Sequence, residues 1–240
     1  MQNSRSLSTA RSRNPAFAQS QSFALPLLFT VFGVIMGSWA GRIPAMAERI
    51  HASHAALSMV LLCGGLGAVL SYPVSSHMMR SFGARTTMLM SGMALLVVLV
   101  AIGAAPTVPS LMMAVLSLGI TASTFDVAVN SAATRREKQT GKSELSKLHG
   151  LGCAGGLAGA TLGSVMAGLH IAPVTHFVML ASPLAMALYF GCSLLDADRA
   201  GEAVEKNRSR CRAARCCSWA RSVSWARWRK AASPTGAACS

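Results

Sequence analysis

Six long runs of apolar residues, separated by short polar connections, dominate the chain between residues 23 and 195. A membrane-spanning helix needs about 20 consecutive, mostly apolar residues, and each run reaches roughly that length. A soluble helical bundle would need polar positions about every 3.6 residues, and the third, fifth and sixth runs have none. The pattern therefore predicts an all-α integral membrane protein with six transmembrane helices. The expected helices cover residues 23–41, 55–79, 86–104, 109–133, 150–169 and 175–195.

Basic residues are distributed unequally between the two sides of the predicted membrane domain. On one side, ten basic residues lie in the leader and in two connections: Arg5, Arg11, Arg13, Arg80, Arg85, Arg135, Arg136, Lys138, Lys142 and Lys147. The opposite side has only Arg42 and Arg49. Because Lys and Arg concentrate in cytoplasmic loops, both termini are predicted to be cytoplasmic. The predicted organisation is a basic cytoplasmic leader (1–21), a six-helix domain (22–196) and a cytoplasmic segment (197–240).

The composition supports the membrane assignment and argues against other classes of protein. Hydrophobic residues make up 52% and charged residues 12% of the chain, whereas soluble domains carry about 25% charged residues. The net charge of +14 reflects topology and anionic lipid rather than nucleic acid, because the basic residues lie between apolar runs and in the tail. The sequence shows no zinc-site spacing, no activated nucleophile arrangement and no phosphate-binding loop. We therefore expect no enzyme activity, metal, cofactor or nucleic-acid partner.

One acidic residue interrupts the fourth apolar run. Asp126 is followed four residues later by Asn130, so both side chains project from one face of the predicted helix. A charged carboxylate in hydrocarbon costs about 2.5 kcal/mol or more, which favours a position facing the interior or a cavity. There, Asp126 would bind and release a proton, and Asn130 would hydrogen-bond a solute or orient the carboxyl group. The alternative is a structural role, in which Asp126 pairs with Arg42 or His149 or caps a backbone group.

Other polar residues near the predicted helix ends have two interpretations each. Arg42 either binds an anionic substrate or, as the preferred interpretation, anchors the first helix by extending to the membrane interface. His149 is a candidate proton relay or an interfacial residue. Trp39 fits the aromatic belt of a membrane interface. Glu137 and Glu144, in the basic connection, are expected to be solvated.

The fifth apolar run is rich in glycine. Gly152, Gly156 and Gly159 recur at helical spacing, which lets a neighbouring helix backbone approach closely. We expect a tight helix–helix contact on this face. Sliding of that contact during a transport cycle is the functional alternative.

The six-helix pattern and three motifs resemble the amino-terminal half of a major facilitator superfamily transporter, in a bacterial branch related to the fucose permeases. The connection "HMMRSFGARTTML" is similar to the superfamily's cytoplasmic loop signature through Phe82, Gly83 and Arg85, although the usual acidic residue is missing. The stretch "GVIMGSWAGRIPAM", with Trp39 and Arg42, resembles the end of the first helix in that branch.

The third motif, "TFDVAVNSAAT", resembles the helix-four signature of the same branch through Asp126 and Asn130. The resemblance implies secondary-active transport of a small solute, a sugar or an exported metabolite, coupled to protons through Asp126. The related symporters carry a second acid on the first helix, where this chain has Ala40. The implied surroundings are the lipid bilayer of a bacterial inner membrane, crossed several times. The alternative is a six-helix membrane scaffold or regulatory partner that transports nothing.

The end of the chain departs from this pattern. The stretch "CRAARCCSWARSVSWARWRKAASPTGAACS" combines three tryptophans and four cysteines with neither apolar periodicity nor a typical disordered composition. Codons displaced by two bases permit the apolar reading "GALGVLGAMAEGGVADW", which resembles the seventh helix of the same branch. We therefore expect that a frameshift truncates a longer transporter. A lone half lacks part of its substrate site unless two copies associate, so self-association is a further expectation.

Overall fold

The computed structural model describes residues 15–195, with side chains described from residue 23 onward. Within this part the chain forms five α-helices and no strand: α2 (Pro15–Arg49), α3 (His54–Ala104), α4 (Val108–Thr140), α5 (Leu145–Gly168) and α6 (Pro173–Ser193). All five include an apolar stretch long enough to cross a membrane. Most of the predicted leader and the predicted segment after residue 196 lie outside the described residues.

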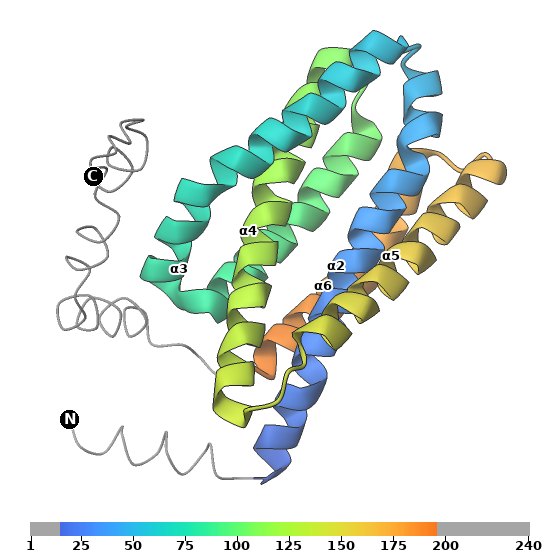
Figure 1. The fold of residues 1–240 in the computed structure, drawn as a ribbon. Helices are drawn as coiled ribbons and strands as arrows, with labels where there is room; N and C mark the ends of the chain where they lie inside the picture. Colours follow the sequence, from blue (N-terminus) through green and yellow to red (C-terminus); the bar gives the residue numbers. More distant parts are fainter. Residues whose placement is uncertain (1–14, 196–240) are drawn as a thin grey trace, which may run out of the picture. The chain divides into compact units, whose positions relative to one another are not determined.

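Helix α3 is much longer than one membrane span requires, and it turns back on itself at Gly83. Its 51 residues would extend about 75 Å as a straight helix, against roughly 30 Å for the hydrocarbon core of a bilayer. Gly83 has φ 77° and ψ 170°, a conformation open essentially to glycine alone. The arms before and after Gly83 run in opposite directions (Figure 1). The predicted helices 55–79 and 86–104 therefore correspond to two arms joined at a turn with no separate loop.

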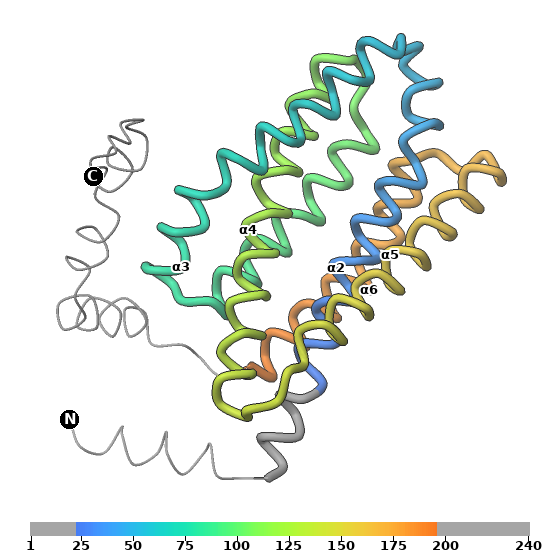
Figure 2. Tube along the Cα trace, in the orientation of Figure 1, coloured from blue at the N-terminus to red at the C-terminus, as the bar shows by residue number. Residues whose placement is uncertain are grey.

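The helical segments alternate in direction along the bundle (Figure 2). The N-terminal part of α2 and the end of α6 lie at the same end of the bundle, where α3 turns and α4 connects to α5 (Figure 1). At the opposite end, Arg49 donates hydrogen bonds to the carbonyl oxygens of Gly103 at 2.7 Å and Ala105 at 2.5 Å. These bonds satisfy carbonyl groups that the end of α3 would otherwise leave without partners.

Helices α2 and α4 continue well past the predicted ends of their spans. Helix α2 continues from the expected end at residue 41 to Arg49, passing through Pro44, because Met46 is buried and adds a further turn to its packed face. Helix α4 continues from the expected residue 133 to Thr140 and ends where Gly141 adopts a left-handed conformation with φ 70°. Apolar runs mark the membrane-buried part of a helix, whereas its end is set by local packing and capping.

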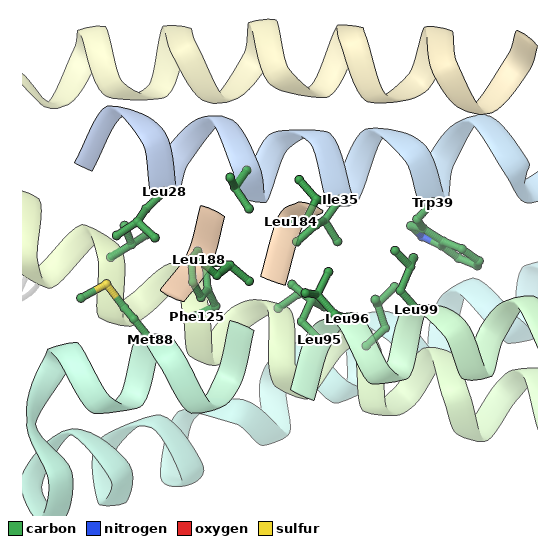
Figure 3. Close-up of a cluster of buried hydrophobic side chains, with 14 of the residues drawn as sticks. Leu28, Ile35, Trp39, Met88, Leu95, Leu96, Leu99, Phe125, Leu184 and Leu188 are labelled. Carbon is green, nitrogen blue, oxygen red and sulfur yellow. The ribbon is translucent and has the colours of Figure 1, made fainter. Parts of the chain in front are cut away.

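Apolar side chains from all five helices form the core, and Figure 3 draws part of it. Trp39 of α2 lies beside Leu99 of the second arm of α3, and Leu188 of α6 lies beside Phe125 of α4 (Figure 3). Phe125 of this core is adjacent in the chain to Asp126, the acid in the apolar part of α4.

Helices α2 and α5 contact each other backbone to backbone through glycine. A Cβ atom added to Gly33 would overlap the carbonyl oxygen of Gly152, and one added to Gly37 would overlap that of Gly156. The same holds for Gly159 against the backbone of α2. The predicted close packing along the glycine face of α5 is therefore confirmed, with α2 as the partner.

Candidate functional site

Asp126 and Asn130 lie one turn apart near the middle of α4, and both side chains are half-buried. The Asn130 side-chain amide donates hydrogen bonds of 2.9 Å to Oδ1 of Asp126 and 2.9 Å to its backbone carbonyl oxygen. Because the amide fixes one carboxylate oxygen, it holds the carboxyl group in one orientation. The structure thus brings together the two residues that the sequence pattern places on one helix face.

Two aromatic side chains of α2 contact neighbours of this pair, Phe125 and His149. Phe125, adjacent to Asp126, stacks on Phe32 with ring centroids 5.3 Å apart and an interplanar angle of 28°. Phe29, one turn earlier on α2, meets the ring of His149 edge to face at 5.2 Å. Sequence reasoning missed these phenylalanines. The signal available to it was the three-residue spacing of Phe29 and Phe32, which places both on one face of a helix.

His149 of α5 is exposed and lies close enough to Asp126 for the two side chains to interact electrostatically. Within the described residues no ion pair joins Asp126 to His149 or to Arg42; the ion pair found there links Arg136 to Glu144 at 3.1 Å. The structural alternative in which Asp126 is neutralised by a direct cation partner therefore does not hold for this part of the chain. Asp126 and His149 interact electrostatically without forming an ion pair.

Arg42 is not an interface anchor. Its side chain is only 1% exposed, and its Nη2 donates to the carbonyl oxygen of Ile171, beyond the end of α5. Trp39 is 7% exposed and belongs to the core, as Figure 3 shows, so its assignment to an aromatic belt is also wrong. Both predictions fail for one reason: α2 continues to Arg49, so neither residue lies at the end of the helix.

The residues of the predicted cytoplasmic loop signature lie at the turn of α3. Gly83 makes the turn itself, and the Thr87 hydroxyl donates a 2.8 Å hydrogen bond to the Gly83 carbonyl oxygen. Phe82 is 48% exposed and Arg85 is half-buried. The glycine of the motif therefore has a direct conformational role in the described structure.

The connection between α4 and α5 is more ordered than the sequence suggests. Oε1 of Glu137 accepts hydrogen bonds from the backbone N–H groups of Glu144 at 2.7 Å and Leu145 at 2.9 Å. These groups lie at the start of α5, which has no cap from its own N-cap residue Glu144. Glu144 pairs instead with Arg136. The expectation that both glutamates are simply solvated is wrong, because each completes a helix end or an ion pair.

No group of three or more His, Cys, Asp or Glu side chains suited to hold a metal ion occurs within residues 15–195. The chemistry available at the Asp126–Asn130 pair is therefore that of one ionisable carboxyl group and one amide. Such a set can hydrogen-bond a polar solute and take up or release a single proton.

Comparison with known proteins gives consistent matches. Residues 20–237 match the sequence profile of the family described as Major Facilitator Superfamily. An uncharacterized transporter of Sinorhizobium fredii is 34% identical over 153 residues, which cover 64% of this chain and 41% of the relative. An uncharacterized MFS-type transporter of Yersinia pestis is 32% identical over 65% of this chain and 41% of the relative.

A third relative, the membrane protein MosC of Rhizobium meliloti, is 28% identical over 75% of this chain and 44% of its own length. The chain thus spans less than half the length of each of these curated relatives. No solved structure matches the chain.

Proposed function

The chain belongs to the major facilitator superfamily of membrane transporters, and on this basis we propose that its full-length protein moves a small polar solute by secondary-active transport coupled to protons. The solute class that we propose is a sugar or an exported metabolite. The observation that carries the proposal is the Asp126–Asn130 pair, an acid and an amide joined at 2.9 Å within an apolar helix. Ionisable side chains inside membrane helices are rare and commonly mark substrate or proton pathways.

The geometry of the pair suits a proton carrier. Oδ1 of Asp126 accepts from Asn130, and a protonated carboxyl group keeps an acceptor oxygen of this kind when the proton binds to the other oxygen, Oδ2. The hydrogen bond therefore survives protonation, and the charge of the site changes without a change in the orientation of the carboxyl group. His149, which interacts electrostatically with Asp126, would favour the ionised state when it carries a proton.

The proposed membrane arrangement counts six spanning segments, because the two arms of α3 each have the length of one span. Both ends of this domain face the cytoplasm in the proposal, supported by the ten basic residues near one side and two near the other. The relatives come from bacteria, which supports a bacterial inner membrane as the location.

We further propose that transport requires sequence beyond this chain. The relatives are more than twice as long as the part that matches, and the apolar reading of a shifted frame supports a second set of helices encoded downstream. The 240-residue chain alone is then expected to show little or no transport, unless two copies associate. Sequencing the coding DNA tests this directly: a shifted frame that ends quickly, or that encodes no further apolar segment, contradicts it.

The test of function uses the full-length protein with its frame restored, reconstituted in proteoliposomes. Uptake or efflux of candidate sugars is measured with and without an imposed proton gradient. Asp126→Asn should abolish the response to the gradient while leaving folding intact, because it keeps the shape of the side chain and removes its proton site. Glu48→Gln is the matched control, since Glu48 is an exposed acid near the opposite end of the bundle. Gradient-driven transport that persists in Asp126→Asn would contradict the proposal and favour a scaffold or regulatory role for the pair.

A further inference from the structure

Two buried polar side chains near the end of the bundle opposite the Gly83 turn have no protein partners for most of their nitrogen atoms. Nε and Nη1 of Arg42, and both ring nitrogens Nδ1 and Nε2 of His176, are buried without a hydrogen bond among the described residues. Arg42 is 1% exposed and His176 2% exposed. Buried polar groups are nearly always hydrogen-bonded, so two such side chains in one region are unusual.

The two side chains belong to one locality. Nη2 of Arg42 binds the carbonyl oxygen of Ile171, which lies two residues before α6 begins at Pro173. His176 lies in the first turn of α6, and the charge of Arg42 acts on it electrostatically. The last turn of α3 closes this region, because the backbone of Gly103 packs against Val174 and the ring of Phe177.

Apart from the Ile171 carbonyl oxygen, which accepts from Nη2 of Arg42, the groups identified beside the unpaired nitrogens are positive. The guanidinium group of Arg42 stays charged in proteins, and the start of α6 carries the positive end of the helix dipole with no side-chain cap. Within the described residues no acidic side chain forms an ion pair with Arg42; the ion pair found there is Arg136–Glu144. A buried charge without a counter-charge is strongly unfavourable.

We propose that Arg42, His176 and the first turn of α6 form a binding site for a small monovalent anion of the halide class. The anion accepts hydrogen bonds from Nε and Nη1 of Arg42 and from one ring N–H of His176. It neutralises the guanidinium group inside the bundle and joins α2 to the start of α6. The site is separate from the Asp126–Asn130 pair: it lies on α2 and α6, and no hydrogen bond or ion pair of the described residues joins it to Asp126 or Asn130 on α4.

The neighbouring arginine provides a matched control. Arg49 lies seven residues further along the same helix, but its side chain is exposed and both of its terminal nitrogens bind carbonyl oxygens of Gly103 and Ala105. It therefore has the same charge and nearly the same position without unsatisfied buried donors. An effect that depends on surface charge alone would involve Arg49 as much as Arg42.

The test is the thermal unfolding of the purified 240-residue chain in detergent. Unfolding is compared in sodium chloride and in sodium gluconate at equal ionic strength. A chloride concentration about 100 times the dissociation constant should raise Tm by about 5–10 °C relative to gluconate. The shift should disappear in Arg42→Gln and remain in Arg49→Gln. An equal Tm in both salts for the wild type, or an undiminished shift in Arg42→Gln, overturns the proposal.

Direct binding provides a second measurement if Arg42→Gln does not fold. Chloride NMR line broadening by the wild-type chain should be removed by added bromide, retained in Arg49→Gln and lost or strongly reduced in His176→Gln. Broadening that is the same in His176→Gln as in wild type would assign chloride to the basic surface and overturn the site. Absence of broadening in the wild type would mean that water, not an anion, satisfies these nitrogens.

Discussion

Asn130 holds one oxygen of Asp126: its side-chain amide donates to Oδ1 at 2.9 Å from one turn further along α4. The same amide also reaches the Asp126 backbone carbonyl oxygen at 2.9 Å. The two bonds restrict the rotation of the amide. Because both residues lie on α4, the orientation of the carboxyl group is set within this one helix.

Replacing Asn130 with Ala should impair gradient-driven transport by the full-length protein while costing about 0.5–1.5 kcal/mol of stability, the usual value for one hydrogen bond. The reason is that the carboxyl group loses its fixed orientation but keeps its proton site. Transport in proteoliposomes and unfolding in detergent are measured on the same preparation. Ser117→Ala is the control, because the Ser117 hydroxyl donates to the Met113 carbonyl oxygen of the same helix, away from the acid. Equal transport by both variants would show that the amide has no functional part.

Replacing Gly37 with Ala should destabilise the protein, although Gly→Ala in an open helix position normally stabilises by up to about 1 kcal/mol. The new methyl group would overlap the backbone of α5 at Gly156, and overpacking of this kind typically costs about 1–3 kcal/mol. The control is Gly65→Ala on α3, where an added Cβ meets no atom within 4 Å. Opposite signs of the two changes in Tm are expected, and a stabilised Gly37→Ala would contradict the described contact.

Asn should be tolerated poorly at residue 83 and well at residue 141. Gly83 has φ 77° and ψ 170°, and Gly141 has φ 70° and ψ 7°. The first conformation is essentially restricted to glycine and costs other residues about 1–3 kcal/mol, whereas Asn accepts the left-handed helical conformation of the second. Gly83→Asn should therefore lower Tm clearly and Gly141→Asn only slightly. Similar Tm values for the two variants would argue against the turn at Gly83.

Replacing Glu137 with Ala should open the connection between α4 and α5. The backbone N–H groups of Glu144 and Leu145 lose their acceptor, so the start of α5 should fray. Trypsin should then cut after Lys142 several-fold faster in detergent-solubilised protein. Glu137→Gln keeps an acceptor oxygen and should cleave at nearly the wild-type rate. If both variants cleave alike, the charge rather than the cap protects this segment.

The sequence predicts the helical membrane character of the chain well, because an apolar run of about 20 residues is itself sufficient to favour a membrane-spanning helix. The start of α4 is an example: Thr107 caps the helix and Pro109 follows in its first turn, and both signals are local. The family comparison confirms the predicted membership of the major facilitator superfamily.

Contacts between distant residues could not be predicted in this way. The environment of Arg42 depends on Ile171, which lies 129 residues later in the chain. Trp39 became a core residue because α2 continues past the end of its apolar run. The cap provided by Glu137 required the start of α5 to lie within hydrogen-bonding distance of the end of α4. In each case a charged or amphipathic residue near the end of an apolar run can lie either at the surface or in a buried or hydrogen-bonded contact. Tertiary packing decides between these two positions.

The turn at Gly83 also bears on how the chain enters a bilayer. Inside hydrocarbon each backbone polar group needs an internal partner. The two arms of α3 meet at Gly83 without a loop, so one arm cannot readily insert before the other. The arms of α3 should therefore integrate together as a helical hairpin. Gly83 would then be the pivot of that hairpin during insertion.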